Sequence, residues 1–214
     1  MKIGWLITLI LGLAASLAQG TFQNLDFESA NIIPDPASPF YPHAVSVANG
    51  LPGWTAYEGT FGGDILYDTL ALGDAAISIH DTNGDISIMQ GNYTLFMQGS
   101  QGIPPGAVVP ALGQVGTVPN NALSLRYYGQ GPFAITFAGQ PVPVSAVGNG
   151  PNYTIFGGDI SAYAGQTGEL RFQGGGFLDN IFFSPTPIPE PGVVTLSTLG
   201  TVLLAWRFLR RTRP

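Results

Sequence analysis

The chain has 214 residues and no cysteine, so no disulfide bond can stabilise it. Residues 21–188 contain twelve acidic residues, two arginines and no lysine, which gives this part of the chain a net charge of −10. Phosphate backbones repel such a charge, and the composition therefore argues against nucleic-acid binding. The length of this part, about 168 residues, suffices for one domain with its own hydrophobic core.

The first twenty residues have the pattern of a secretory signal peptide. Lys2 supplies the positive charge that opens such a signal, and residues 3–13 form its apolar region. Ser16 and Ala18 are small residues at the −3 and −1 positions of a cleavage site after Ala18. Cleavage after Gly20 is an alternative, and a permanent N-terminal anchor is another. The pattern favours a signal peptide over residues 1–20 and export of the domain that begins at residue 21.

Short stretches of alternating apolar and polar residues fill residues 21–184, which is the pattern of β-strands. In residues 76–80, for example, Ile77 and Ile79 share one face while Ser78 and His80 share the other. The pattern predicts strands at 44–47, 54–57, 76–80, 86–89, 93–98, 123–128, 133–137, 142–144, 153–156, 169–173 and 177–183.

Two stretches between these strands have other expected structures. Residues 99–121 are rich in glycine and proline and are expected to form a long loop, and Asp159 is expected to cap one helical turn. Many short strands without a long helix predict an all-β domain, an antiparallel β-sandwich, over residues 21–184.

The end of the chain has three parts in a fixed order. A proline-rich spacer, residues 185–191, ends in Pro189, Glu190 and Pro191, and an apolar run without charge comes next over residues 192–206. That run would measure about 22 Å as a helix, against about 30 Å of membrane hydrocarbon, so the predicted transmembrane helix extends over residues 192–209. Residues 210–214 are the expected cytoplasmic tail. Four arginines fix the expected orientation in the membrane: Arg207, Arg210, Arg211 and Arg213.

This order of tripeptide, short membrane helix and arginine cluster resembles the PEP-CTERM sorting signal of exported bacterial proteins. The resemblance implies that an exosortase, a cysteine transpeptidase-like membrane enzyme, recognises the signal and cuts near the tripeptide. It also implies a path from an anchor in the inner membrane to the cell surface or to an extracellular matrix of exopolysaccharide. An ordinary C-terminal anchor on a proline-rich stalk is the alternative.

A second resemblance covers most of residues 21–184. Residues 24–28, 51–54 and 178–181 resemble the opening strand, the Gly-Trp segment and the closing strand of galactose-binding-like jelly rolls, a class that includes many carbohydrate-binding modules. The resemblance implies a structural calcium ion shared by Glu28 and Asp179. Plain surface or turn carboxylates are the alternative for both residues.

A further acidic motif, Asp81, Asn83 and Asp85, has the alternate spacing of the start of an EF-hand. An EF-hand needs glycine at the sixth position and glutamate at the twelfth, where this chain has Ile86 and Asn92. An Asn-Gly hairpin turn explains the same residues and is the favoured interpretation.

The remaining polar and aromatic residues give no catalytic motif, and no catalytic residue is predicted. His43 and His80 lack the sequence context of a known hydrolase. Aromatic side chains could stack on sugar rings or pack in the core, and for Trp54 we expect packing; the other candidates are Tyr57, Tyr67, Tyr127 and Tyr128. The sequence thus predicts an exported, non-enzymatic protein with a structural or binding role. A carbohydrate-binding module for exopolysaccharide is the alternative, and a polysaccharide-active enzyme is a more distant one.

Overall fold

The computed structural model describes residues 21–71, 73–100 and 108–188. The predicted signal peptide, transmembrane helix and arginine-rich tail lie outside these residues, as do Pro189, Glu190 and Pro191. The elements are, in chain order, β1 (Ala44–Ser46), α1 (Val47–Gly50), β2 (Thr55–Ala56), β3 (Asp64–Tyr67), β4 (Ala76–Asp81), β5 (Tyr93–Gln98), β6 (Ala111–Thr117), β7 (Ser124–Gln130), β8 (Ala134–Phe137), β9 (Gln140–Pro141), β10 (Val144–Asn149), β11 (Thr154–Asp159), the 3-10 helix η1 (Ser161–Tyr163), β12 (Thr167–Gln173) and β13 (Gly176–Ser184).

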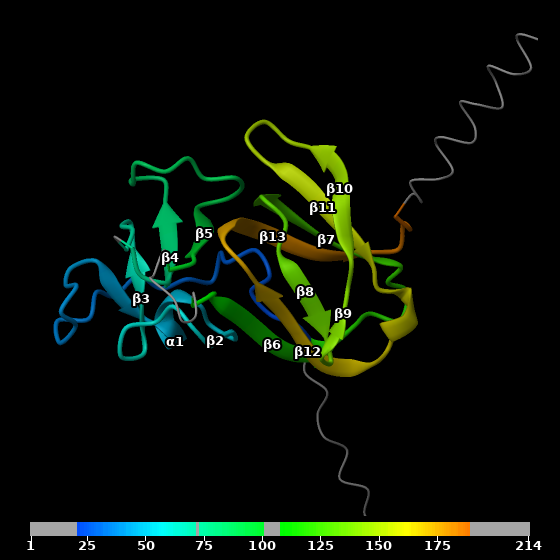
Figure 1. Ribbon diagram of the computed structural model, residues 1–214, viewed down its shortest axis with the longest axis horizontal. Coiled ribbons are helices and arrows are strands. Elements are labelled where there is room, and N and C mark those ends of the chain that lie inside the picture. Colours follow the sequence, from blue (N-terminus) through cyan, green and yellow to red (C-terminus); the bar gives the residue numbers. More distant parts are fainter. Residues whose placement is uncertain (1–20, 72, 101–107, 189–214) are drawn as a thin grey trace, which may run out of the picture.

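These strands form two sheets, which confirms the predicted all-β sandwich. The larger sheet has eight strands in the order β1-β3-β4-β5-β13-β7-β11-β10, and the smaller has five in the order β2-β6-β12-β8-β9. Figure 1 shows β13 and β7 at the centre, between β4 and β5 on one side and β10 and β11 on the other. Neighbouring strands run antiparallel except for β3 and β4, which run parallel and depart from the expected arrangement.

The core consists of apolar side chains that alternate along the strands and meet between the sheets. Leu125 and Tyr127 of β7 and Leu170 and Phe172 of β12 are fully buried there. Tyr127 meets Phe172 edge to face with ring centroids 5.6 Å apart, a favoured geometry for aromatic pairs. Burial of each large side chain contributes about 1.5–3 kcal/mol, so contacts of this kind stabilise the domain without disulfide bonds.

Residues 99–121 are not one long loop, because β6 lies within them and pairs with β2 and β12. The prediction was wrong because the glycines of β6 serve close packing. A Cβ added at Gly113 would come within 2.7 Å of Glu169, and one at Gly116 within 2.7 Å of the Phe22 ring. Glycine in this strand therefore makes room for neighbours, although it is usually a loop residue.

Two other expectations near β4 need correction. Residues 86–89 do not form a strand, so β4 joins β5 through residues 82–92 and not through a tight Asn-Gly hairpin. Strand β3 lies in a stretch where the sequence pattern predicted none. The expected helical turn is confirmed as η1, but its N-cap residue is Ile160 and not Asp159. The Asp159 carboxylate accepts a hydrogen bond from the backbone N–H of Ser161, the first residue of η1, at 2.8 Å.

Candidate functional site

The structure brings Glu28 and Asp179, the two predicted calcium ligands, to the same segment, residues 88–94. Glu28 Oε1 accepts hydrogen bonds from the backbone N–H groups of Asn92 at 2.8 Å and Tyr93 at 3.1 Å. Its Oε2 accepts one from the side-chain amide of Asn92 at 2.8 Å. Glu28 therefore ties the N-terminal part of the domain to the connection between β4 and β5.

Asp179 approaches the same segment from β13 and is fully buried. Its Oδ2 accepts hydrogen bonds from the Thr94 hydroxyl at 2.8 Å and the Gln90 N–H at 3.1 Å, and Oδ1 accepts one from the Asn180 N–H at 2.7 Å. Burial raises the pKa of Asp179 to about 7; these hydrogen bonds oppose the shift, and the negative charge of Glu28 adds to it. Asp179 is therefore a carboxyl group that titrates near neutral pH.

This arrangement fits a calcium ion only in part. Calcium takes six to eight oxygen ligands, and both carboxylates already accept two hydrogen bonds on one oxygen and one on the other. No three His, Cys, Asp or Glu side chains form a possible metal-binding group in the part of the chain that the structure describes. Glu28 and Asp179 could contribute their less occupied oxygens, and backbone carbonyls or water would have to supply the others. Calcium at this place stays a prediction.

We expect calcium to raise the melting temperature of residues 21–184 more at pH 8 than at pH 5.5. The reason is that only ionised Asp179 can bind the cation, and its pKa is about 7. Thermal melts with calcium and with EGTA at the two pH values measure the effect, and Glu28→Gln should remove most of it. A melting temperature that EGTA leaves unchanged at pH 8 would exclude the site.

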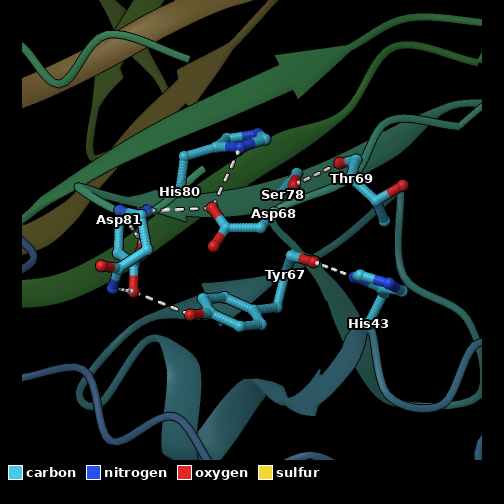
Figure 2. Close-up of polar contacts among 8 residues, drawn as sticks. His43, Tyr67, Asp68, Thr69, Ser78, His80 and Asp81 are labelled. Carbon is cyan, nitrogen blue, oxygen red and sulfur yellow. Dashed lines mark hydrogen bonds and ion pairs between the residues drawn. The ribbon is translucent and has the colours of Figure 1, made fainter. Parts of the chain in front are cut away.

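A second polar cluster joins the ends of β3 and β4 (Figure 2). Asp68, in a left-handed conformation with φ 46°, accepts a hydrogen bond from the Asp81 N–H at 3.0 Å and lies 3.6 Å from Nδ1 of His80. The Tyr67 hydroxyl donates to Asp81 at 2.7 Å. Burial raises the pKa of Asp68, whereas hydrogen bonds from Tyr67 and Asn83 lower that of Asp81 against the effect of burial. The cluster fastens two parallel strand ends to each other.

His80 is the most deeply buried member of this cluster, with 2% of its surface exposed. Burial lowers its pKa to about 4, so the imidazole is neutral at pH 7. Its ring meets Phe96 edge to face with centroids 6.4 Å apart, and Nε2 has no hydrogen-bond partner among the described residues. These surroundings suit a packed histidine better than a general base that needs access to substrate.

The motif of Asp81, Asn83 and Asp85 is a turn and not a ligand loop in this structure. Asp81 accepts hydrogen bonds from the backbone N–H of Asn83 at 2.7 Å and from its side-chain amide at 3.1 Å. The two residues thus bond each other, which is typical of an Asx turn.

His43 lies on the other side of Tyr67, with Nδ1 3.2 Å from the Tyr67 carbonyl oxygen (Figure 2). It lines a pocket of about 390 Å³ together with the rings of Phe40 and Phe61, whose centroids are 4.7 Å apart. The sequence does not predict this pocket, because its residues come from loops and from the end of β3, which no periodic pattern brings together.

The candidate aromatic residues divide into packed and exposed ones. The Trp54 ring contacts Phe27 and Phe172, its N–H donates to the Asn24 carbonyl at 2.9 Å, and only 5% of its surface is exposed. Packing was the expected role of Trp54, and the structure confirms it. Tyr127 is also a core residue, with no exposed surface.

Tyr57 and Tyr128 lie at the surface. Tyr57 is 42% exposed; the Arg171 guanidinium lies 4.0 Å from its ring centroid, and its hydroxyl donates to Glu169. Tyr128 points away from the core on β7 and stacks on Tyr153 with ring centroids 4.1 Å apart. Tyr128 and Tyr153 are therefore the pair that could meet a ligand on the outer face of the larger sheet.

Among the described residues, no helix is long and apolar enough to cross a membrane. The predicted transmembrane segment, residues 192–209, lies beyond them. No family model matches the chain, and no curated protein or solved structure matches it either. Its function therefore has to be inferred from its own residues.

Proposed function

We propose that the chain is an exported bacterial protein of the PEP-CTERM type, which reaches the cell surface or an extracellular matrix after processing at its C-terminal signal. One observation carries the proposal. Pro189, Glu190 and Pro191 precede an uncharged apolar run and a group of four arginines, and a signal-peptide pattern opens the same chain. Export also accounts for basic residues concentrated at the two ends and a lysine-free part between them.

The mechanism of sorting depends on the chemistry of these parts. The apolar run holds the folded domain at the outer face of the inner membrane, and the arginines stay with the headgroups on the cytoplasmic side. Prolines fix φ and lack an N–H donor, so Pro189 and Pro191 keep Glu190 out of helix and sheet. Such a segment would be accessible to an exosortase-type enzyme.

For the domain itself we propose a galactose-binding-like jelly roll with a non-enzymatic role in the matrix. Two packed sheets and the approach of Glu28 and Asp179 to residues 88–94 support this assignment. A carbohydrate-binding role toward exopolysaccharide is the alternative, and the surface pair Tyr128 and Tyr153 would carry it.

Replacing Pro189, Glu190 and Pro191 by alanines should leave the protein full-length in the membrane fraction. Without the tripeptide, the processing enzyme lacks its recognition segment, while the apolar run still anchors the chain. Immunoblots of membrane and culture supernatant measure the distribution, and the mass of the released protein reports both cleavage sites. Pro36→Ala, a proline at an exposed position of the domain, is the control and should be released normally. Normal release of the triple variant would refute the sorting assignment.

A further inference from the structure

The residues that follow β13 contact the domain. Residues 185–188, called the C-terminal strap here, continue from the last strand and stay in contact with the larger sheet. Before the strap, the Leu123 N–H donates to the Ser184 carbonyl at 2.8 Å, and within it the Thr186 N–H donates to the Ser184 hydroxyl at 3.1 Å. The expected proline-rich spacer therefore begins as a docked segment.

Two side chains of β7 bind the same backbone carbonyl group of the strap. The carbonyl oxygen of Thr186 accepts hydrogen bonds from the Ser124 hydroxyl at 2.7 Å and from Nη2 of Arg126 at 3.3 Å. Nε of Arg126 also donates to the Ser124 hydroxyl at 3.1 Å. Arg126 is one of only two basic residues in residues 21–188, and its bond to the strap is charge-assisted.

The apolar end of the strap, Ile188, packs into a space above Gly157 of β11, called the socket here. Ile188 lies over Gly157, so that a Cβ added at this glycine would come within 2.5 Å of Cδ1 of Ile188 and 3.3 Å of Val147. Figure 1 shows the orange segment after β13 near the base of the β10–β11 hairpin. A side chain at position 157 would occupy the space that Ile188 fills.

The strap is held by few contacts, and its sequence explains why. Pro185 and Pro187 have no N–H group, so the strap cannot continue the ladder of β13 as another length of strand. Its attachment depends on the Thr186 carbonyl and on Ile188. A segment held in this way can be detached without unfolding the sheet.

We infer that the docked strap restrains processing at the adjacent tripeptide by keeping it close to the domain. This inference rests on the proposed function. Ile188 and Gly192, where the apolar run begins, are four positions apart, so the chain between them reaches at most about 14 Å. A detached strap adds four residues, roughly 14 Å more. The processing enzyme has to bind the segment between domain and membrane, and detachment about doubles the length available to it.

The test uses the full chain with Arg126→Gln and Ile188→Ala combined, which remove the charged hydrogen bond and the side chain in the socket. We expect release into the supernatant at least threefold faster than for the wild type. Gly157→Ala should act in the same direction from the sheet side, because the added Cβ displaces Ile188. Ile33→Ala is the matched control; it truncates an isoleucine that is 53% exposed, and release should not change.

Limited digestion with proteinase K gives a readout that does not need the processing enzyme. For full-length protein in detergent, residues 185–188 should resist cleavage in the wild type and become sensitive in both strap variants, with unchanged melting temperature. If the wild-type protein is released and both variants are released no faster, the inference about the strap is wrong, whereas the proposed sorting function stands. Equal protease resistance of the strap in wild type and variants would overturn it too. Failure of the proposed function has a different signature, normal release of the alanine tripeptide variant.

Discussion

Asp179→Asn should make the free energy of unfolding rise with pH between about pH 4 and pH 6.5. In the wild-type protein, the titrations of Asp179 and His80 should together leave this free energy nearly constant over the same range. The reason is the raised pKa of Asp179, about 7 when folded against roughly 3.9 when unfolded. In this window the folded state binds the proton that the unfolded state has lost. The contribution of Asp179 to stability is therefore present below about pH 4 and is lost as pH rises through 7. The loss is on the order of 4 kcal/mol.

His80 has the opposite effect over nearly the same range. Its pKa is about 4 when folded against roughly 6.5 when unfolded, so the unfolded state binds the extra proton. Its contribution is present above about pH 6.5 and is lost as pH falls through 4, by on the order of 3 kcal/mol. Between about pH 4 and pH 6.5, the pH dependence of the unfolding free energy that Asp179 causes cancels the one that His80 causes. His80→Phe, which keeps an aromatic ring beside Phe96, should therefore make stability fall with rising pH.

Urea unfolding of the domain, residues 21–184, at pH 4, 5, 6, 7 and 8 measures these slopes. The comparison uses the two single variants, the double variant and the wild type, so that the titration of all other carboxyl groups is shared. We expect slopes of opposite sign for the single variants, and for the double variant a curve parallel to that of the wild type between pH 4 and pH 6.5. Two single variants with the same slope as the wild type would show that neither group titrates as its burial indicates.

The strands that the sequence predicts well are those in which alternation alone decides the structure. In β4, Ile77 and Ile79 face the core, and His80 faces the other side of the sheet, as expected. Strand β6 was missed because Gly113 and Gly116 pack against side chains that come from distant parts of the chain. Local propensity cannot reveal such contacts, because only the assembled sheets create them.

The candidate sites show the same limit. Glu28 and Asp179 were paired through a family resemblance, and the structure does bring both to residues 88–94. The backbone N–H groups of Gln90 and Asn92 that meet them have no signature in the sequence, since every residue except proline has such a group. The burial that raises the pKa of Asp179 also depends on how this connection folds over β13.

Trp54→Ala should destabilise the protein by about 3–5 kcal/mol, the usual cost of truncating a fully packed aromatic residue. The indole joins both halves of the core, because its ring contacts Phe27 near the start of the domain and Phe172 of β12. The change also leaves the Asn24 carbonyl without the hydrogen bond from the indole N–H. Urea unfolding at constant pH measures the loss, and Trp54→Phe should cost less because it retains most of the ring packing.

Tyr128→Ala is the matched change on the outer face of the larger sheet, where the tyrosine stacks on Tyr153. Its cost should be about 1 kcal/mol, because the ring is partly solvated and loses mainly the aromatic pair. Retention on an exopolysaccharide column separates the two roles of aromatic residues. Stacking on sugar predicts weaker retention for Tyr128→Ala at nearly full stability, and unchanged retention for the folded fraction of Trp54→Phe. Equal destabilisation by alanine at both positions would contradict the assignment of Trp54 to the core and Tyr128 to the surface.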